Sequence, residues 1–420
     1  MSQAGEPAKR SVPTVSSVPP PNKPATRAIG ERPRMSRFLR MLILATVVVH
    51  VPIAAAVAHA AHRAGAPMPW LFGVVWSVLG IGLFVGRARA GMPDHRRHGA
   101  LVRFVDIPYF IHWCGGLFLL IPAIIATIVA PIVQLARGTP VSMLSLPWDF
   151  YTWAYAVGLV VAAYGILVRR RWFVVREVEI ALAGLDPSFD GYRIAHLSDL
   201  HIGAVTPRAW GERWMRASNA RSPDLVVVTG DMVTSGTDFH EDIAAVIGQL
   251  RGKDGVFVSM GNHDYFGEGE PLISLLGARG ARVLRNEGVV LTRGEGRVYL
   301  AAIDDTWTRR DDLAKALRDR PVVSGKELPT ILLAHDPERF RAAAKQGVQL
   351  TLSGHTHGGQ VAMPFLYRWV SLGKFAHHYN VGLYAKGYAK LYVHPGLGTT
   401  GPPIRLGVAP AVVMITLRAA

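Results

Sequence analysis

The stretch YRIAHLSDLH, Tyr192–His201, decides how this chain folds, because an apolar run ends there directly in residues that can bind a metal ion. A second run of the same kind, LVVVTGD, follows at Leu225–Asp231. Short runs rich in Val, Ile and Leu predict strands, and the longer mixed segments between them predict helices. The alternation of the two favours an α/β domain in the C-terminal part of the chain.

Five such runs are each followed by polar residues that can ligate metals. The runs are Tyr192–Leu197, Leu225–Thr229, Val256–Met260, Ile331–Ala334 and Leu350–Ser353. The helix-like stretches between them include Trp210–Ala220, Glu241–Arg251, Pro271–Ala278 and Arg309–Leu317. Strand ends of an open α/β sheet converge on one rim, so side chains from five separate segments can meet in one place.

The polar residues after these strands offer carboxylate, imidazole and amide groups, and no thiolate. They are Asp199, His201, Asp231, Asn262, His263, His335, His355 and His357. Such a set suits two divalent ions of Mn, Fe, Zn, Co or Ni better than a structural zinc site. Two neighbouring ions can deprotonate a water and stabilise charge on the entering and leaving oxygens of a phosphoryl transfer. Two carboxylates cannot neutralise two divalent ions, so the site would attract a phosphate anion.

In this order, the five motifs resemble the calcineurin-like metallophosphoesterase superfamily over about residues 190–400. The motif Gly354–Gln360, the segment Gly396–Thr400 and the apolar front of the chain are similar to a bacterial membrane-associated branch. That branch includes YkuE-like phosphodiesterases and a UDP-2,3-diacylglucosamine hydrolase. The resemblance implies an α/β fold in which two mixed sheets and their flanking helices form a four-layer α-β-β-α sandwich.

The resemblance also implies a role for each polar residue. Asp231 would bridge two metal ions, and His263 would protonate the leaving oxygen or stabilise the transition state. One ion would be held by Asp199, His201 and His357, and the other by Asn262, His335 and His355. A metal-free, degenerate descendant would be expected to lack at least one of these ligands, and none is missing.

One position departs from the family pattern. Relatives that carry a second aspartate three residues after the bridging one use it to orient the histidine, whereas Thr234 stands there in this chain. His263 is therefore expected either to be held by another group or to act mainly as a phosphate ligand.

The N-terminal part of the chain predicts a membrane domain. Residues 1–36 are rich in Pro, Ser, Ala and Arg and predict a disordered basic tail. Between 37 and 172 lie four apolar stretches that are long enough, or nearly so, to cross a bilayer. They are Leu42–Ala60, Trp70–Val85, Tyr109–Leu135 and Tyr151–Val168. Residues 173–420 would then form the catalytic domain.

The distribution of charge indicates the orientation. Of the net charge of +16, +13 falls in residues 1–172 and only +3 in residues 173–420. Arginines crowd the tail, the second connection and the exit from the fourth stretch, so these are predicted to be cytoplasmic by the positive-inside rule. The expected location is the plasma (inner) membrane, with the catalytic domain in the cytoplasm. A cleaved signal peptide at the first stretch is the alternative.

Several histidines and one aromatic segment leave alternatives open. Four histidines in or beside the apolar stretches could serve haem or proton transfer, but no carboxylate partner lies within those stretches, so they are expected to pack in the bundle or to sit at its water interface. They are His50, His59, His62 and His112. His377 and His378 either touch substrate or lie in a solvated loop. The segment Met363–Tyr379, with Trp369 and Phe375, could rest on lipid headgroups or pack as a lid.

The expected function is hydrolysis of a phosphodiester or pyrophosphate bond, with membrane lipids as surroundings and a substrate that can itself be lipid-linked. Because the basic excess lies outside the catalytic domain, a nucleic-acid substrate is not expected. No protein partner is inferable. Two other functions stay open: a broad phosphodiesterase acting on soluble nucleotides, and a membrane sensor or transporter whose phosphoesterase domain is inert.

Overall fold

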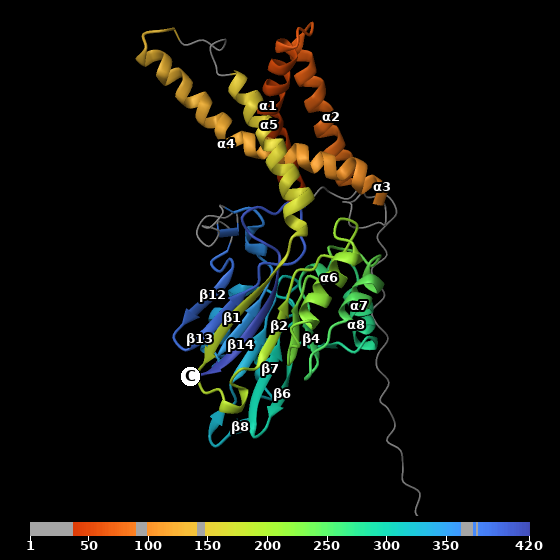
Figure 1. The fold of residues 1–420 in the computed structure, drawn as a ribbon, viewed down its shortest axis with the longest axis vertical. Helices are drawn as coiled ribbons and strands as arrows, with labels where there is room; N and C mark the ends of the chain where they lie inside the picture. The colour runs from red at the N-terminus through yellow and green to blue at the C-terminus, as the bar shows by residue number, and fades with distance from the viewer. Residues whose placement is uncertain (1–36, 90–98, 141–147, 363–372, 375–376) are drawn as a thin grey trace, which may run out of the picture.

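The computed structural model describes residues 37–89, 99–140, 148–362, 373–374 and 377–420. A bundle of long helices forms one end of the molecule and an α/β domain forms the other (Figure 1). The predicted tail, and Trp369 and Phe375 of the aromatic segment, lie outside the described residues.

Four helical spans among the described residues are long and apolar enough to cross a membrane, as predicted. They are Arg40–Arg63, Pro69–Ala88, Gly99–Ala136 and Trp148–Arg171. They contain α1 (Arg37–Arg63), α2 (Pro69–Arg89), α3 (Gly99–Leu101), the π-helical segment η2 (Val102–Asp106), α4 (Ile107–Ala136), α5 (Trp148–Ala163), the π-helical segment η4 (Tyr164–Val168) and the 3-10 helix η5 (Arg169–Arg171).

Small residues let these helices approach closely. A Cβ atom added at Gly73 would lie 2.3 Å from the carbonyl oxygen of Ala54, and one at Gly158 would lie 2.6 Å from that of Gly115. The first pair joins α2 to α1, and the second joins α5 to α4. Close backbone approach at glycine is a common way of packing helices inside a bilayer.

His50 and His112 form a hydrogen-bonded chain inside the bundle. Their Nε2 atoms are 3.0 Å apart, Nδ1 of His112 is 2.5 Å from the Tyr155 hydroxyl, and Nδ1 of His50 is 2.7 Å from the carbonyl of Thr46. If Tyr155 donates to His112, His112 to His50 and His50 to Thr46, both rings are satisfied in their neutral forms. Gly80 closes over the pair, because its Cβ would lie 2.4 Å from His50 Nε2. These contacts favour packing over haem ligation.

His59 has a carboxylate partner just outside the predicted apolar stretches. Its Nε2 lies 2.9 Å from the carboxylate of Asp149, an exposed residue at the start of α5, which agrees with a position of this histidine at the water interface of the bundle. The apolar pattern could not reveal the pair, because 90 residues separate its members.

Two six-stranded mixed sheets form the α/β domain. The first sheet consists, in spatial order, of β1 (Val174–Leu182), β14 (Ala411–Ala419), β2 (Arg193–Leu197), β3 (Leu225–Thr229), β4 (Val256–Ser259) and β5 (Arg282–Val283). The second consists of β12 (Gly382–Lys386), β13 (Ala389–Val393), β11 (Leu350–Ser353), β10 (Thr330–Leu333), β7 (Gly296–Ala302) and β6 (Glu287–Arg293). A short hairpin of β8 (Val322–Val323) and β9 (Lys326–Glu327) stands apart.

Helices cover the outer face of each sheet, which confirms the predicted four-layer α-β-β-α fold. On the first sheet lie α6 (Arg208–Asn219), α7 (His240–Ile247) and α8 (Gly269–Ala278), and on the second lie α9 (Leu313–Leu317) and α10 (Phe340–Lys345). Trp214 of α6 packs in one cluster with Val226 of β3. Ile194 and Leu352 belong to the core between the sheets, and Ala316 of α9 packs in a third cluster.

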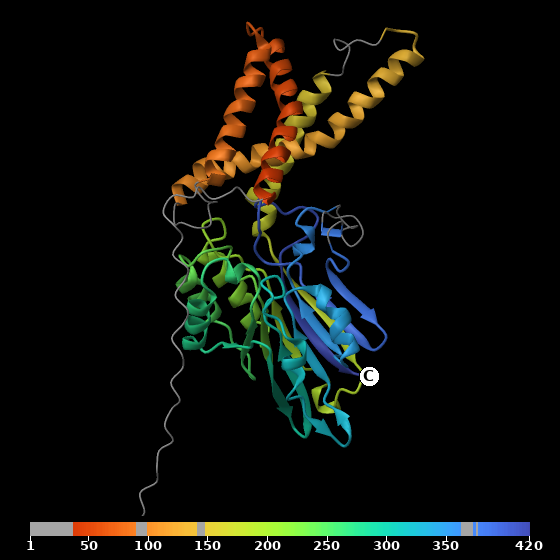
Figure 2. The ribbon, with the colours of Figure 1, turned by 180° about the vertical axis from the view of Figure 1, so that it is seen from behind.

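Strand directions place the polar strand ends beside the helical bundle. β1 follows η5 and runs away from the bundle, β14 is parallel to β1, and β2 is antiparallel to β14. β3 and β4 are parallel to β2, so the carboxyl ends of all three strands return toward the bundle. Figure 2 shows this end of the sandwich next to the helices.

The five predicted strands coincide with β2, β3, β4, β10 and β11 to within one residue at each end. They belong to two sheets rather than to one open sheet, so their ends meet at an edge that both sheets share. The predicted helix Arg309–Leu317 is wrong in its first part. Asp305 closes a turn by accepting the Thr308 N–H at 2.6 Å, and α9 begins only after Asp312 caps it.

Candidate metal centre

Five of the predicted metal ligands have left-handed backbone conformations. They are Asp199, His201, Asp231, His355 and His357, with φ of 53°, 44°, 52°, 71° and 53°. Residues with a Cβ atom rarely adopt positive φ, and such strain gathers at functional sites. Each chain segment therefore turns sharply as it leaves its strand.

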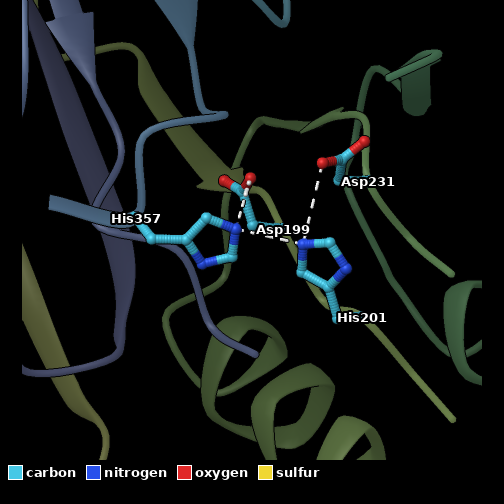
Figure 3. A group of neighbouring side chains, drawn as sticks. All are labelled: Asp199, His201, Asp231 and His357. Atoms are coloured by element: carbon cyan, nitrogen blue, oxygen red, sulfur yellow. Dashed lines mark hydrogen bonds and ion pairs between the residues drawn. The ribbon is translucent and has the colours of Figure 1, made fainter. Parts of the chain in front are cut away.

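The first group of side chains comprises Asp199, His201, Asp231 and His357, all buried, and their ligand atoms lie within 4.8 Å of one another. Nε2 of His201 is 3.0 Å from Nε2 of His357 and 3.6 Å from an oxygen of Asp231. Nε2 of His357 is 3.4 Å from an oxygen of Asp199 (Figure 3). Four ligand atoms thus converge from the ends of β2, β3 and β11.

The second group comprises Asp231, His335 and His355, and it shares Asp231 with the first. His335 Nε2 lies 3.2 Å from the Asp231 carboxylate and 3.3 Å from His355 Nδ1. The Nδ1–H of His335 donates to the carbonyl of Thr229 at 2.6 Å, which leaves Nε2 directed at the group. A backbone carbonyl that holds the distal nitrogen in this way is typical of metal-binding histidines.

Buried polar atoms without hydrogen-bond partners show that the residues fit metal ions. Asp199 Oδ2 and Asn262 Oδ1 have no partner among the described residues, although both atoms are buried. Orphaned buried oxygens are costly unless an ion or a water satisfies them. The Asn262 oxygen is also the donor expected for the second group. The ligand roles of the seven residues stay predictions.

Burial and mutual charge determine the protonation of the ligands. Burial raises the pKa of Asp199 to about 6 and lowers the pKa of His201 and of His355 to about 3. Burial also opposes the charged forms of Asp231 and His335, but their attraction prevails. It holds the pKa of Asp231 well below its ordinary range and raises the pKa of His335 to about 10. His201 and His355 are therefore ready as neutral ligands, whereas His335 must first lose a proton.

The structure identifies the group that holds His263. Its Nδ1–H donates to the backbone carbonyl of Thr234 at 2.5 Å, and its backbone N–H donates to Asp231 at 2.9 Å. The ring also lies edge-on against His201, with centroids 4.8 Å apart. His263 is thus oriented by the main chain at position 234 instead of by a carboxylate there, and its Nε2 is left for the reaction.

Asp264 is a structural residue of the site whose role the sequence did not reveal. Its buried carboxylate accepts N–H groups of Asp231, Met232, Val233 and Gly261 at 2.8–3.2 Å. Burial raises the pKa of Asp264 to about 7. By joining the loop after β3 to the loop after β4, this residue fixes Asp231 and Asn262 relative to each other. The only sequence feature that could have indicated this role is its place at the end of the polar motif Gly261–Asp264.

Arg405 is the second unforeseen residue. It is fully buried, and its guanidinium donates to the carbonyls of His357, Pro395 and Gly398 at 3.1, 2.6 and 2.6 Å. Burial lowers the pKa of Arg405 to about 9. Its backbone N–H donates to the carbonyl of Gly165 in η4 at 3.3 Å. One residue thus links a predicted metal ligand to the end of the last membrane span.

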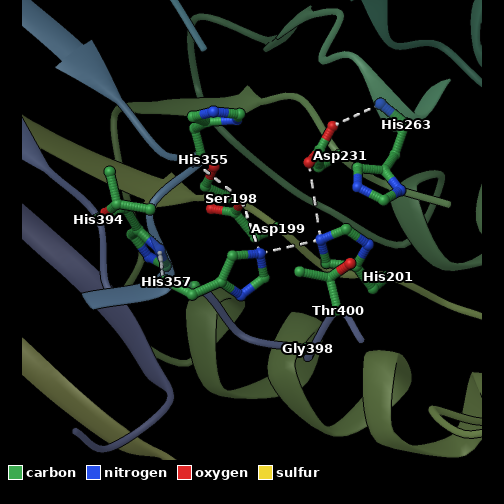
Figure 4. Close-up of polar contacts among 12 residues, drawn as sticks. Ser198, Asp199, His201, Asp231, His263, His355, His357, His394, Gly398 and Thr400 are labelled. Carbon is green, nitrogen blue, oxygen red and sulfur yellow. Dashed lines mark hydrogen bonds and ion pairs between the residues drawn. The ribbon is translucent and has the colours of Figure 1, made fainter. Parts of the chain in front are cut away.

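Of the two remaining histidine candidates, one lies beside the site and the other does not. The His377 ring lies 5.4 Å from that of His355, so this residue borders the second group. His378 instead pairs with Glu338 at 3.3 Å and is exposed. Figure 4 shows how His263 and His355 flank Asp231 on the two sides of the site.

Comparisons with known proteins agree with this geometry. A family model described as calcineurin-like phosphoesterase matches residues 192–359. A transmembrane protein with metallophosphoesterase domain from Danio rerio is 32% identical over 281 residues, which cover 64% of this chain and 62% of that protein. The uncharacterized metallophosphoesterase YkuE of Bacillus subtilis (strain 168) is 32% identical over 237 residues, covering 55% of this chain and 80% of that protein.

Among solved structures, a phosphopantetheinyl hydrolase from Mycobacterium tuberculosis aligns with 50% of this chain and 91% of its own, at 14% identity and a TM-score of 0.32. The aligned part of this chain spans 62% of the Danio rerio relative, which is less than two thirds of its length. It spans 80% of the Bacillus relative.

Proposed function

Because the chain belongs to the calcineurin-like phosphoesterase family, we propose that it hydrolyses a phosphodiester or pyrophosphate bond in a lipid-linked substrate at the membrane surface. The two groups of ligands would hold two divalent ions, which supply an activated water and Lewis acidity at the phosphoryl oxygens. Both groups are made of this chain's own residues.

One observation carries the membrane part of the proposal: the loops of the metal centre pack directly on the helical bundle. Ile404, which precedes Arg405, belongs to a buried cluster with Phe110 of α4 and Ile166 of η4, and Val361 packs against the same cluster. Val361 lies four residues after His357. A substrate anchored in the bilayer would therefore need to rise only a short way to reach the ligands.

The chain's own side chains supply the rest of the chemistry. Asp231 belongs to both groups and can bridge them. His263 can protonate the leaving oxygen through Nε2, because Nδ1 donates to the Thr234 carbonyl and leaves Nε2 free for the reaction. Asp264 and Arg405 position ligand loops and touch no reacting atom.

The proposed orientation places the catalytic domain in the cytoplasm. Arg40, Arg87, Arg103 and Arg169–Arg171 lie at or near ends of the four spans. Figure 1 shows the end of α2, α3 and the end of α5 beside the catalytic domain. The positive-inside rule assigns this side to the cytoplasm. An alkaline phosphatase fused after Ala420 should be inactive in intact cells, and an active fusion would reverse the orientation.

The test uses the full-length protein in detergent micelles with Mn²⁺. Two substrates are compared: soluble bis-p-nitrophenyl phosphate, and a long-chain diacyl phosphodiester lipid diluted in the micelles. We expect hydrolysis of both to need metal, and hydrolysis of the lipid to follow its mole fraction in the micelle at constant bulk concentration.

The Asp231→Asn variant serves as the control and should hydrolyse neither substrate. Turnover of the soluble ester with no attack on the diacyl phosphodiester lipid would contradict the proposed lipid-linked substrate and favour a phosphodiesterase for soluble nucleotides. Full metal occupancy with no turnover of either substrate would favour an inert domain in a sensor.

A further inference from the structure

Two exposed aromatic side chains flank the open side of the metal centre. Phe266 is 45% exposed, and its ring centroid lies 4.6 Å from that of His263. Trp307 is 63% exposed, and its ring centroid lies 5.6 Å from that of His355. Among the described residues from Val174 onward, no other Phe or Trp is exposed.

The two histidines that these aromatic rings contact are the partly exposed histidines of the site. Asp199, His201, Asp231, His335 and His357 are buried, whereas His263 and His355 are partly exposed. His263 is the predicted proton donor, and His355 belongs to the second group of ligands. Phe266 and Trp307 therefore border the accessible edge of the reaction centre on two sides.

The loops that carry the two aromatic residues are fixed to each other. The Tyr265 hydroxyl donates to Asp304 at 2.6 Å, and the Arg310 guanidinium lies 4.4 Å over the Tyr265 ring. Asp304 is buried and also accepts from Arg285 Nε at 2.8 Å. Tyr265 directly precedes Phe266 in the sequence. Asp304 and Arg310 lie three residues before and three residues after Trp307. The separation of the two rings is thus set by contacts beneath them.

Single exposed apolar residues on a protein surface need no special explanation. Here, however, both exposed rings contact site histidines, and neither buries its area in the domain core. An aromatic ring offers a large apolar surface that becomes favourable when a ligand covers it. Rings at the edge of a phosphoryl site are within reach of the organic group attached to the phosphorus.

We propose that Phe266 and Trp307 form an aromatic clasp that binds a bulky apolar group of the substrate, within a few bonds of the scissile phosphate. The inference rests on the proposed phosphoesterase function and deepens it, because it names a recognition element. The clasp selects phosphoesters whose apolar part begins close to phosphorus over esters of small or polar alcohols. Flat rings can stack in it, and saturated groups can pack in it.

Binding of non-hydrolysable phosphonates tests the clasp apart from turnover. Calorimetric titration of the full-length, Mn²⁺-loaded protein in detergent would give affinities for methylphosphonate, cyclohexylphosphonate and phenylphosphonate. All three offer the same anion to the metals and differ only in the organic group. We expect phenylphosphonate to bind about tenfold more tightly than methylphosphonate, the scale of one aromatic contact.

The variants Phe266→Ala and Trp307→Ala should each reduce this affinity ratio about threefold or more, and the double variant should bring it near one. Trp307→Phe should keep most of the preference, because an aromatic face remains. Tyr388→Ala is the matched control: Tyr388 is 49% exposed but donates to Ala344 in α10, away from the metal groups, so the ratio should not change.

Cyclohexylphosphonate separates the two modes of recognition. Binding as tight as that of phenylphosphonate indicates apolar packing, and binding as weak as that of methylphosphonate indicates ring stacking; either supports the clasp. An equal affinity for all three ligands in the wild-type protein, or a ratio that survives the double substitution, would overturn it. A clear phosphonate preference in a protein without turnover would reject the proposed hydrolysis and leave the clasp standing.

Discussion

The imidazole of His263 donates a hydrogen bond from Nδ1 to the main-chain carbonyl of Thr234 at 2.5 Å. Every residue has a main-chain carbonyl, whatever side chain it carries. A residue other than aspartate at position 234 can therefore still accept the hydrogen bond from His263 Nδ1. The Thr234 hydroxyl itself makes only a long contact, 3.4 Å, with the carbonyl of His201. The orientation of the histidine thus depends on the course of the loop and not on the side chain at position 234.

Removing the imidazole and removing the threonine side chain should therefore have very different effects. We expect His263→Ala to lower kcat by about 10²–10⁴-fold, the usual contribution of a positioned proton donor. Thr234→Ala should remain within about threefold of wild type, because the carbonyl is kept. Steady-state hydrolysis of bis-p-nitrophenyl phosphate by the full-length protein measures both. A loss in Thr234→Ala as large as that in His263→Ala would show that the hydroxyl matters.

The sharing of Asp231 between the two ligand groups predicts how metal stoichiometry responds to substitution. Asp199→Asn should weaken one site and leave about one ion per chain, whereas Asp231→Asn should weaken both. Elemental analysis after dialysis against micromolar Mn²⁺ counts the bound metal directly. One retained ion in Asp231→Asn would contradict the bridging role, and the wild-type protein in the same dialysis provides the reference.

The proton on His335 predicts that metal affinity depends on pH. In the metal-free protein the pKa of His335 is raised to about 10, so binding near neutral pH must displace one proton. The apparent affinity for Mn²⁺ should then rise about tenfold per pH unit between pH 7 and 8. Below the pKa of Asp199, about 6, a second proton must leave and the slope should steepen.

Titration calorimetry in buffers of different ionisation enthalpy gives the number of protons released. His335→Gln removes the ionisable ring, so its residual binding should lose the proton release near neutral pH. An affinity that does not change with pH would show that Asp231 and His335 are not charged in the metal-free protein.

The contact between the last span and the site predicts that Gly165 tolerates no side chain. A Cβ atom there would lie 2.7 Å from Ile404 Cγ1 and 3.2 Å from the carbonyl oxygen of Arg405. Overpacking of this kind costs roughly 1–3 kcal/mol and would displace the loop that holds His357. We expect Gly165→Ala to lower kcat of the full-length protein about tenfold.

Gly82→Ala is the matched control, because it lies in a membrane span and its Cβ would meet nothing within 4 Å. Its activity should equal that of wild type. Full activity of Gly165→Ala would mean that the helical bundle and the metal centre are independent.

The parts of the fold that follow from local pattern could be predicted from sequence. Continuous apolar runs such as Leu225–Thr229 could be placed because fully buried strands leave a strong signal. The first residue of a helix was harder to predict. The turn at Asp305 and the helix cap at Asp312 depend on side-chain hydrogen bonds, which the spacing of apolar residues does not reveal.

The candidate site divides in the same way. Its ligands could be named because Asp and His at strand ends have a distinctive chemistry, and the structure brings Asp199 and His357 within 3.4 Å although they are far apart in sequence. Arg405 could not be named, because a single arginine in a loop rich in Gly and Pro has no local signature. Its role comes from the carbonyl of His357 and from those of Pro395 and Gly398 on a second segment, and it is visible only after folding.

The position of β14 also bears on how the protein is made. This strand lies between β1 and β2, yet it follows every other described strand in the chain. During translation the membrane spans leave the ribosome first, and the first sheet keeps an open gap until residues 411–419 emerge. The membrane spans of a nascent chain can therefore insert into the bilayer well before β14 pairs with β2. Only that pairing completes the sheet whose strand end carries Asp199. The enzyme reaches its working form only where its substrate is proposed to be.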